Sequence, residues 1–439
     1  MIEKIKKNLE RGILINPDDI DSQNLTIIES FPDINSKKTI KDFVKLYTQR
    51  YYQIQSILKQ RQDMLSVTAI RNTKTLGEKE TTTIIGMILN ITKTKNNNII
   101  LTIEDPTGTT KAIITHSNKE VFLVASNLSP DEVIGVRGQT GKDVIFAKSI
   151  TLPDIPLNKE YKKSPKDEVA VFISDVHLGS SFFLREEFEK FIEWINTDEK
   201  IKYLFILGDL VEGIGIFPGQ EKELLIKDIY EQYADFSNYI LKINPKINII
   251  LAPGNHDAVR VAEPQPILAK LLPALAQQKN IHFVSSPSTV KIGQTDTFSG
   301  FDILIYHGFS FPFYASNIEE IRMSGGLTKT EEIMEYLLKV RHLAPTHGST
   351  QYQMGYDNDP LVIKTAPDFF VSGHIHRCSK KNYRNTTILN CSCWISQTDY
   401  QEKRGLVPQP AKAMYVNLKT REVEIVDFGK GTLENDSKH

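Results

Sequence analysis

Five short apolar segments of the chain each end beside residues that can bind a divalent metal ion. The segments and the polar residues after them are Val169–Ile173 with Asp175 and His177, Tyr203–Leu207 with Asp209, Ile247–Leu251 with Asn255, His256 and Asp257, Ile303–Tyr306 with His307, and Asp368–Val371 with His374 and His376. Apolar runs of this length and composition predict buried strands, and loops at strand ends are where a rigid sheet holds functional groups. Carboxylates, imidazoles and one amide gathered there predict a mixed nitrogen and oxygen site suited to Mn, Fe or Zn.

The spacing inside these clusters has a simple geometric interpretation. Residues two apart in a strand point to the same side, so Asp175 and His177 are expected to face one way, and His374 and His376 likewise. Two cations about 3.5–4 Å apart can activate a water, drain charge from phosphoryl oxygens and stabilise the leaving oxygen. The pattern therefore favours a two-metal site that hydrolyses phosphate esters.

Composition bounds the answer further. A chain of 439 residues predicts two or three domains, and 40% hydrophobic with 24% charged residues is typical of a soluble globular protein. The 53 basic and 54 acidic side chains give a net charge of −1, so any contact with nucleic acid must come from local patches. No apolar run reaches membrane-spanning length, and we expect a cytoplasmic protein without a membrane partner.

The three cysteines are too few for a disulfide framework, which favours a reducing compartment. Cys391 and Cys393 have the spacing of half a zinc site. No second cysteine pair follows them, so a zinc site is disfavoured.

Four further regions follow from local patterns. Residues 1–78 are expected to form a small helical region, with an amphipathic helix over Ile40–Gln62 that packs against the protein, the alternative being an arm that contacts nucleic acid. Residues 156–168 are a polar, basic linker, and 429–439 a flexible tail. Between 169 and 428, strands alternate with helical patterns at Arg185–Ile195, Gln220–Ile243, Pro266–Gln278 and Ile318–Arg341, and a hairpin is expected at Lys412–Phe428. This alternation predicts a layered α/β domain.

Residues 79–155 have a different pattern. Five short strands with glycine and turn residues between them predict a small all-β barrel, most simply an oligonucleotide/oligosaccharide-binding (OB) fold. Such barrels bind single strands through aromatic side chains on a basic face. Phe122 and Phe146 are the only aromatic residues in this stretch, which favours a barrel that contacts protein over one that contacts nucleic acid.

The ordered motifs Asp-x-His, Gly-Asp, Gly-Asn-His-Asp, His-Gly and Gly-His-x-His resemble those of the calcineurin-like metallophosphoesterases. The resemblance implies a four-layer αββα sandwich over 169–428. It implies one metal ion bound by Asp175, His177, Asp209 and His376, and a second bound by Asp209, Asn255, His307 and His374. It further implies that His256 acts as the general acid at the leaving oxygen and that Asp257 orients His256.

Other segments resemble the small-subunit family of the archaeal family D DNA polymerases. They are Pro218–Glu221 with Ile226–Tyr233, Pro253–Pro266, Arg341–Pro345, and Trp394 with Gln397–Gln401 and Pro408. The resemblance implies a proofreading 3′-to-5′ exonuclease that uses two divalent ions, with Mn favoured over Fe or Zn. It also implies a large catalytic polymerase subunit as partner, a single-stranded or mismatched DNA 3′ end as substrate, and contacts with other replisome proteins.

Basic and aromatic residues follow the ligand loops closely in the sequence. We expect Arg260, Phe309 and Tyr314, with Phe311 and Phe313, to stack on or clamp the DNA 3′ end; the alternative is that they cap the site or contact the partner. Two rival functions remain at this stage. One is a stand-alone phosphodiesterase for small substrates, and the other is a catalytically weak subunit that supports polymerase assembly.

Overall fold

The computed structural model describes residues 25–34, 37–64, 66–398, 401–402 and 405–429. They form two compact units, each built from segments that are distant in the sequence. The first unit contains the described residues of 1–33, 160–309 and 367–439, and the second those of 34–159 and 310–366. The predicted domain of 169–428 is thus interrupted, because the segment 310–366 groups with the barrel.

One six-stranded sheet of the first unit carries most of the predicted strands. Its order is β10 (Ile281–Phe283), β9 (Asn248–Ala252), β8 (Ile201–Leu207), β7 (Val169–Ile173), β16 (Lys412–Asn417) and β17 (Val423–Asp427). The first four strands are parallel, so their carboxyl ends meet at one edge of the sheet, and β16 and β17 run antiparallel as the predicted hairpin. All five residues of β7 are buried, because both faces of this sheet are covered.

The second sheet of this unit also has six strands. Its order is β1 (Leu25–Ser30), β11 (Ser288–Ile292), β12 (Phe301–Ile305), β13 (Phe369–Ser372), β15 (Thr386–Asn390) and β14 (Ser379–Tyr383). Strands β12, β13 and β15 are parallel, and the other pairings are antiparallel. The ends of β12 and β13 supply the last three candidate ligands.

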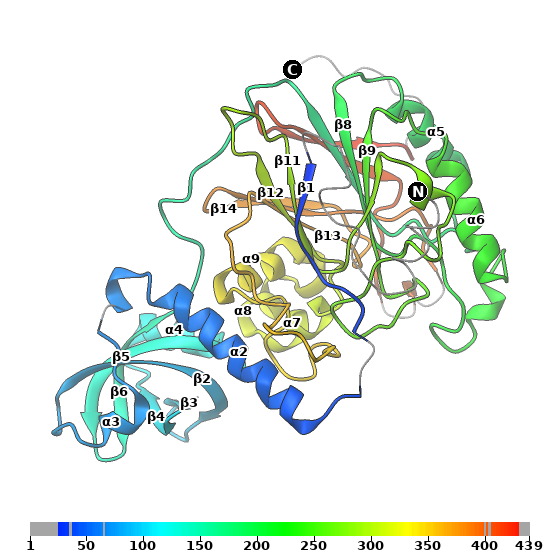
Figure 1. Cartoon of the computed structure of the whole chain (residues 1–439). Helices are drawn as coiled ribbons and strands as arrows, with labels where there is room; N and C mark the ends of the chain where they lie inside the picture. Colours follow the sequence, from blue (N-terminus) through cyan, green and yellow to red (C-terminus); the bar gives the residue numbers. More distant parts are fainter. Residues whose placement is uncertain (1–24, 35–36, 65, 399–400, 403–404, 430–439) are drawn as a thin grey trace. The chain divides into compact units, whose positions relative to one another are not determined.

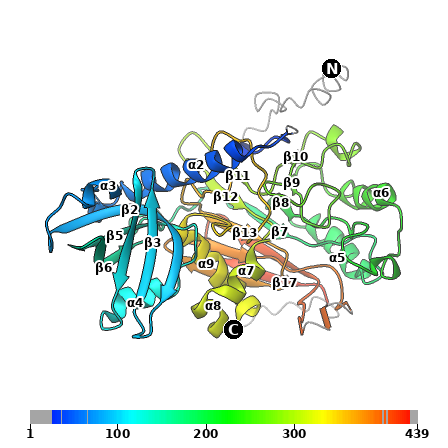
Figure 2. The same ribbon diagram turned by 90° about the horizontal axis from the view of Figure 1, so that it is seen from below.

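Two apolar cores make the first unit a layered α/β structure. Phe172 of β7 and Ile303 of β12 belong to the core between the two sheets, whereas Val171 of β7 faces a core that also contains Phe188 of α5 (Arg185–Ile195). Helices α5 and α6 (Ile229–Ile240) lie side by side against that outer face (Figure 1; Figure 2). This arrangement confirms the mixed α/β fold, with two sheets packed face to face.

The second unit contains the predicted barrel. It closes in the order β2 (Thr81–Lys93), β3 (Ile99–Asp105), β4 (Gly108–Ile114), β6 (Val144–Thr151) and β5 (Val133–Gly141), with α3 (Ile70–Thr73) and α4 (Lys119–Ser126) beside it. The same unit holds α2 (Ile40–Leu58), α7 (Phe311–Asn317), α8 (Glu319–Ser324) and α9 (Thr330–Val340). Barrel residues such as Ile84, Leu101 and Ile134 fill one interior core, as an OB fold requires.

A buried ion pair joins α2 to the segment that follows α9. Arg50 and Asp359 are both fully buried, and Nε of Arg50 donates to Oδ2 of Asp359 at 2.7 Å. Nε2 of His342 lies 3.0 Å from the same oxygen. Burial alone would raise the pKa of Asp359, but Arg50 and His342 hold it below its usual value. Because a buried charge is costly without its partner, this contact explains how α2 is fixed within its unit.

Several local expectations are corrected. Leu25–Ser30 is a strand and not part of a helical region, because its β-branched residues pair antiparallel with β11. The helix expected over Pro266–Gln278 is only a short 3₁₀ turn at Leu275–Gln277. The helix expected over Ile318–Arg341 is broken between α8 and α9, where Gly325 and Gly326 have positive φ. Residues 1–24 lie outside the described part of the chain. None of the described helices is long and apolar enough to span a bilayer.

One buried carboxyl in the second unit predicts a pH dependence of stability. Glu132 is 1% exposed, and the hydroxyl of Tyr336 on α9 donates to it. Burial raises the pKa of Glu132 to about 8 from its usual 4.5. The folded chain therefore keeps this proton across a range in which the unfolded chain has lost it, and the free energy of unfolding falls as the pH rises between those values.

Replacing Glu132 with Gln should remove this dependence. Relative to the parent chain, the free energy of unfolding of the Glu132→Gln variant should rise by on the order of 3 kcal/mol between about pH 5 and about pH 8. Urea unfolding followed by circular dichroism at several pH values measures the difference. Glu120→Gln, on the exposed face of α4, is the control and should track the parent chain. A pH-independent difference for Glu132→Gln would contradict the assignment.

Candidate functional site

The structure brings all seven predicted metal ligands together. They come from the carboxyl ends of β7, β8 and β9 in one sheet and of β12 and β13 in the other. Three groups of three residues have ligand atoms within 4.8 Å of one another. Two consist of predicted ligands: Asp175, His177 and His376 form the first, and Asp209, His307 and His374 the second. The third joins Glu212 to His177 and His256. The seventh residue, Asn255, places Oδ1 3.2 Å from Nε2 of His307. Five loops that are distant in the sequence therefore converge on one site.

Asp209 lies between the two groups. Its Oδ2 is 3.7 Å from Nε2 of His177 in the first group and 3.2 Å from Nε2 of His307 in the second. Its Oδ1 accepts the backbone N–H of His256 at 2.7 Å, which fixes the carboxylate plane. A carboxylate held in this way can reach two cations at once, as the bridging role requires.

Three of the four ligand histidines have a hydrogen-bond partner at Nδ1, on the side of the ring away from the cluster. Nδ1 of His307 lies 2.8 Å from the carbonyl of Leu207, and Nδ1 of His177 lies 3.0 Å from Oε2 of Glu212. Nε2 of Gln401 lies 2.7 Å from Nδ1 of His376. In all three rings Nδ1 is occupied and Nε2 is turned toward the cluster, which is the arrangement that fixes a metal-binding imidazole.

The ligand loops have a strained backbone. Asp175, His177, Asp209, His374 and His376 all have positive φ, between 50° and 70°, although side chains with a Cβ rarely adopt this conformation. Such strain costs on the order of 1–3 kcal/mol per residue and is found where a functional geometry demands it. The predicted reason for the Asp-x-His and His-x-His pairs was therefore wrong, because these residues lie beyond the ends of β7 and β13 and strand alternation does not align them.

Two glycines permit the close packing of these loops. A Cβ on Gly254 would collide with the carboxylate and backbone N of Asp209. A Cβ on Gly373 would collide with Ser174 and with the carboxylate of Asp175. Any larger residue at either position would push a candidate ligand out of place.

His256 lies beside the first group of ligands. Its ring is 4.6 Å from the ring of His177 in an edge-to-face contact. Its Nδ1 lies 2.8 Å from the carbonyl oxygen of Glu212, so Nδ1 carries a hydrogen and the reactive proton belongs on Nε2. This position suits proton transfer to a group held at the cluster.

Asp257 does not orient His256, contrary to the prediction. Its carboxylate accepts the N–H groups of Gly254 and Leu210 at 2.8 and 3.3 Å and the hydroxyl of Tyr233 at 3.1 Å. Burial and the nearby Asp209 raise the pKa of Asp257 to about 7. Asp257 therefore holds the backbone of the ligand loops, and the carbonyl of Glu212 positions His256 instead.

Glu212 is the main site residue that the motifs did not reveal. Its carboxylate contacts His177, and its backbone carbonyl contacts His256, so it positions both rings. Gln220 in turn donates through Nε2 to both the carboxylate and the carbonyl of Glu212 at 3.0 Å. The sequence contained one hint, because Glu212 follows Asp209 by three residues in the same loop.

The charges of the site are mutually dependent. Burial would raise the pKa of Asp209, but His307, His256 and His177 hold it well below its usual value. Burial would lower the pKa of His307, but Asp209 raises it to about 10. Burial and His307 lower the pKa of His374 to about 3. A buried set of carboxylates and imidazoles that face one another can release these protons and bind a pair of divalent cations in their place.

The donor set fits the implied metal ions. Two carboxylates, one amide oxygen and four imidazoles are mixed nitrogen and oxygen ligands, which suit Mn, Fe and Zn alike. Among the described residues, the groups that could hold a metal contain no cysteine. Cys391 and Cys393 are buried free thiols, so the zinc half-site that the sequence already disfavours has no support in the described residues.

Most of the predicted DNA clamp has a structural role. Tyr314 is fully buried, where its hydroxyl donates to Ser349, so its ring cannot stack on DNA and that prediction was wrong. Phe311 is fully buried as well. The guanidinium of Arg260 binds Asp33 and the carbonyl of Pro264, so its charge is already compensated. Phe309 lies near the site, with its ring 5.8 Å from that of His374.

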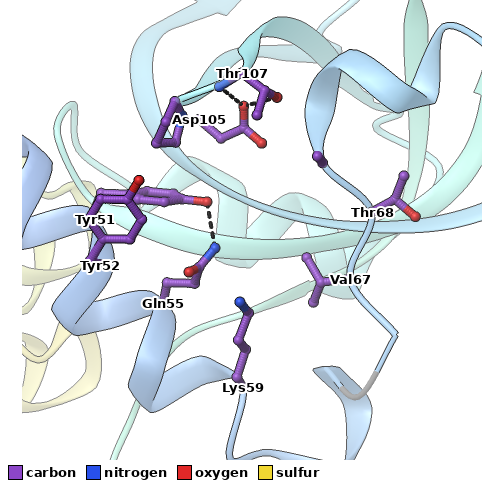
Figure 3. A pocket seen from close by; sticks show the side chains of 10 residues that line it. Tyr51, Tyr52, Gln55, Lys59, Val67, Thr68, Asp105 and Thr107 are labelled. Carbon is purple, nitrogen blue, oxygen red and sulfur yellow. Dashed lines mark hydrogen bonds between the residues drawn. The ribbon is translucent and has the colours of Figure 1, made fainter.

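A pocket between α2 and the turn after β3 offers less chemistry. Several of its polar groups already have partners: Gln55 donates to the hydroxyl of Tyr51 at 2.7 Å, and Asp105 accepts from the backbone N–H of Thr107 (Figure 3). Asp105 also accepts from the backbone N–H of Ile70. Asp105 therefore caps local structure. The cluster at the strand ends is the better candidate for catalysis.

Comparison with known proteins agrees with this geometry. Residues 169–378 match the calcineurin-like phosphoesterase family, which implies divalent metal ions, and residues 82–156 match the OB-fold nucleic acid binding domain. The chain is 34% identical to a DNA polymerase II small subunit of Methanothermobacter thermautotrophicus, over 93% of this chain and 84% of the relative. It is 34% identical to the subunit of Methanocaldococcus jannaschii (99% and 74%) and 36% identical to that of Archaeoglobus fulgidus (86% and 76%). The chain therefore belongs to the family of archaeal DNA polymerase II small subunits, those of the family D polymerases.

Proposed function

We propose that this chain is the 3′-to-5′ exonuclease subunit of a replicative DNA polymerase and works with a large catalytic subunit. Its substrate is the phosphodiester bond at a single-stranded or mismatched DNA 3′ end. The observation that carries the proposal is the position of Asp209, whose Oδ2 lies between histidines of both ligand groups, with His256 beside them. A subunit that served only in assembly would have no need for this strained and complete cluster.

The residues divide the chemistry among them. When bound, two divalent cations would polarise the phosphoryl group and activate the attacking water. His256 donates a proton from Nε2 to the O3′ atom that leaves, while its Nδ1–H stays bonded to the carbonyl of Glu212. Glu212 fixes the orientations of the His177 and His256 rings. Phe309 places an apolar ring near His374.

The net charge of −1 agrees with an enzyme in which a second subunit contributes most of the DNA binding. A nuclease that binds DNA alone needs a basic surface for the phosphates, because phosphate contacts dominate affinity for nucleic acid. A large subunit can supply that surface, and this chain then needs only to receive the strand end. We therefore propose Mn as the metal, DNA as substrate, and the large polymerase subunit as the partner, together with other replisome proteins.

The complex of this chain with its large subunit should shorten 5′-labelled DNA from the 3′ end in the presence of Mn. His256→Ala should lower kcat by about 10²- to 10⁴-fold, because the leaving oxygen loses its proton donor. The ladder of products on a denaturing gel measures both effects. His116→Ala, on an exposed histidine of the barrel unit, is the matched control.

The metal content of His256→Ala should equal that of the parent chain, which separates a lost acid from a lost site. Hydrolysis of small phosphate esters without DNA shortening would instead indicate a stand-alone phosphodiesterase. Inactivity on both substrates would indicate an assembly subunit.

Metal stoichiometry should follow the two ligand groups. The parent chain should retain about two Mn ions, His374→Ala about one, and Asp209→Ala none, because Asp209 serves both groups. Inductively coupled plasma mass spectrometry after gel filtration counts the ions. Equal retention by the Asp209→Ala and His374→Ala variants would rule out a bridging carboxylate.

Glu212→Gln should weaken metal binding without removing a ligand. The amide cannot accept hydrogen bonds from both His177 and Gln220 through charged oxygens, and loss of such an outer contact costs about 10- to 100-fold in affinity or activity. Titration with Mn measures the change. Glu221→Gln, an exposed neighbour, should bind Mn like the parent chain, and the idea fails if the two variants behave alike.

A further inference from the structure

The connection between β8 and α6 contains a surface loop, residues 213–219, that is anchored by buried groups. Gly213 donates its backbone N–H to Oε1 of Gln232 at 2.9 Å, and Ile216 donates its N–H to Oε1 of Gln220 at 3.0 Å. Gln232 and Gln220 are 0% and 1% exposed. Hydrogen bonds to buried side-chain amides hold a loop in one conformation, because breaking these bonds would leave unpaired polar groups inside the protein.

This loop and the candidate general acid form one connected structure. The residue before the loop, Glu212, contacts Nδ1 of His256 through its carbonyl. A Cβ added to Gly213 would collide with the carbonyl of His256 and would lie 3.1 Å from Cγ1 of Ile216. Ile216 therefore packs over Gly213, which packs against His256. The loop cannot move without moving His256.

The loop presents apolar side chains to solvent at this point. Ile214 and Ile216 are 46% and 38% exposed. Residues 213–220 contain no charged side chain, so no side chain of the loop would form an ion pair with a phosphate. What it offers is an uncharged apolar surface beside the group that protonates the leaving oxygen.

We propose that Ile214 and Ile216 contact the nucleobase at the 3′ end of the strand that is shortened. The proposal rests on the proposed exonuclease function. The phosphate of the terminal nucleotide belongs at the charged cluster, and the base is the apolar part of the same nucleotide that must lie within a few ångströms of it. Aliphatic side chains pack well against unstacked bases. An unpaired 3′ terminal base can reach such a surface, whereas a paired one remains stacked in the duplex.

The test measures binding and does not depend on cleavage. The complex of this chain with its large subunit is mixed with fluorescein-labelled single-stranded DNA whose last linkage is a phosphorothioate, so that the DNA stays intact. One DNA ends in adenine and the other in an abasic residue. The parent complex should bind the adenine end about tenfold more tightly, and Ile214→Ser with Ile216→Ser should reduce this ratio to less than about twofold. Fluorescence anisotropy gives both dissociation constants.

Leu241→Ser is the matched control, because Leu241 is a 46% exposed apolar residue at the far end of α6; it should keep the tenfold ratio. An unchanged ratio in the double variant, or no preference in the parent complex, would overturn the proposal. The proposal would also be overturned if the double variant only lost its binding to the large subunit, because the loop would then contact protein and not DNA. A parent complex that prefers the adenine end yet never shortens ordinary DNA would overturn the exonuclease function and leave this contact in place.

Discussion

The site depends on one buried carboxylate, that of Asp209, held between two groups of histidines. A carboxylate taken out of water must be compensated by opposite charge or by hydrogen bonds. Here the N–H of His256 binds one oxygen, and histidines of both groups face the other. The same residue has a left-handed backbone. Cations are the natural compensation for such an arrangement, and the strained loops, the two glycines and the paired sheets all serve to hold it.

Much of this could be predicted from the sequence, because the evidence is local. An apolar run followed by Asp or His identifies a strand end and its ligand. The ends of β7, β8 and β9 meet because these strands are parallel neighbours in one sheet, and those of β12 and β13 meet for the same reason in the other. The barrel strands could also be predicted, because alternating apolar residues and the turns between them are local features of the sequence. The mechanism of alignment could not be predicted, since the positive φ values of Asp175 and His177 arise from packing between loops that are distant in the sequence.

Burial set the limit of the sequence predictions. Tyr314 and Arg260 have the residue types of a DNA clamp, yet one ring is enclosed and the other side chain is paired with Asp33. Strand β1 was missed because its partner, β11, lies more than 250 residues away. Glu212 and Gln220 were missed because their roles depend on hydrogen bonds to rings that no spacing rule connects to them. In each case a contact between distant residues decides the outcome.

A pair of metal ions alone does not choose a substrate, since the same ligands serve phosphatases and nucleases. Choice must come from groups that surround the ions and touch the parts of the substrate that do not react. Two such groups in this chain contact the candidate site residues: Phe309 lies against His374, and the loop of Ile214 and Ile216 follows Glu212, whose carbonyl contacts His256. Both are apolar and neither is charged. A site built in this way favours a substrate with an uncharged, flat part directly beside its phosphate, and a nucleotide at the end of a strand has that form.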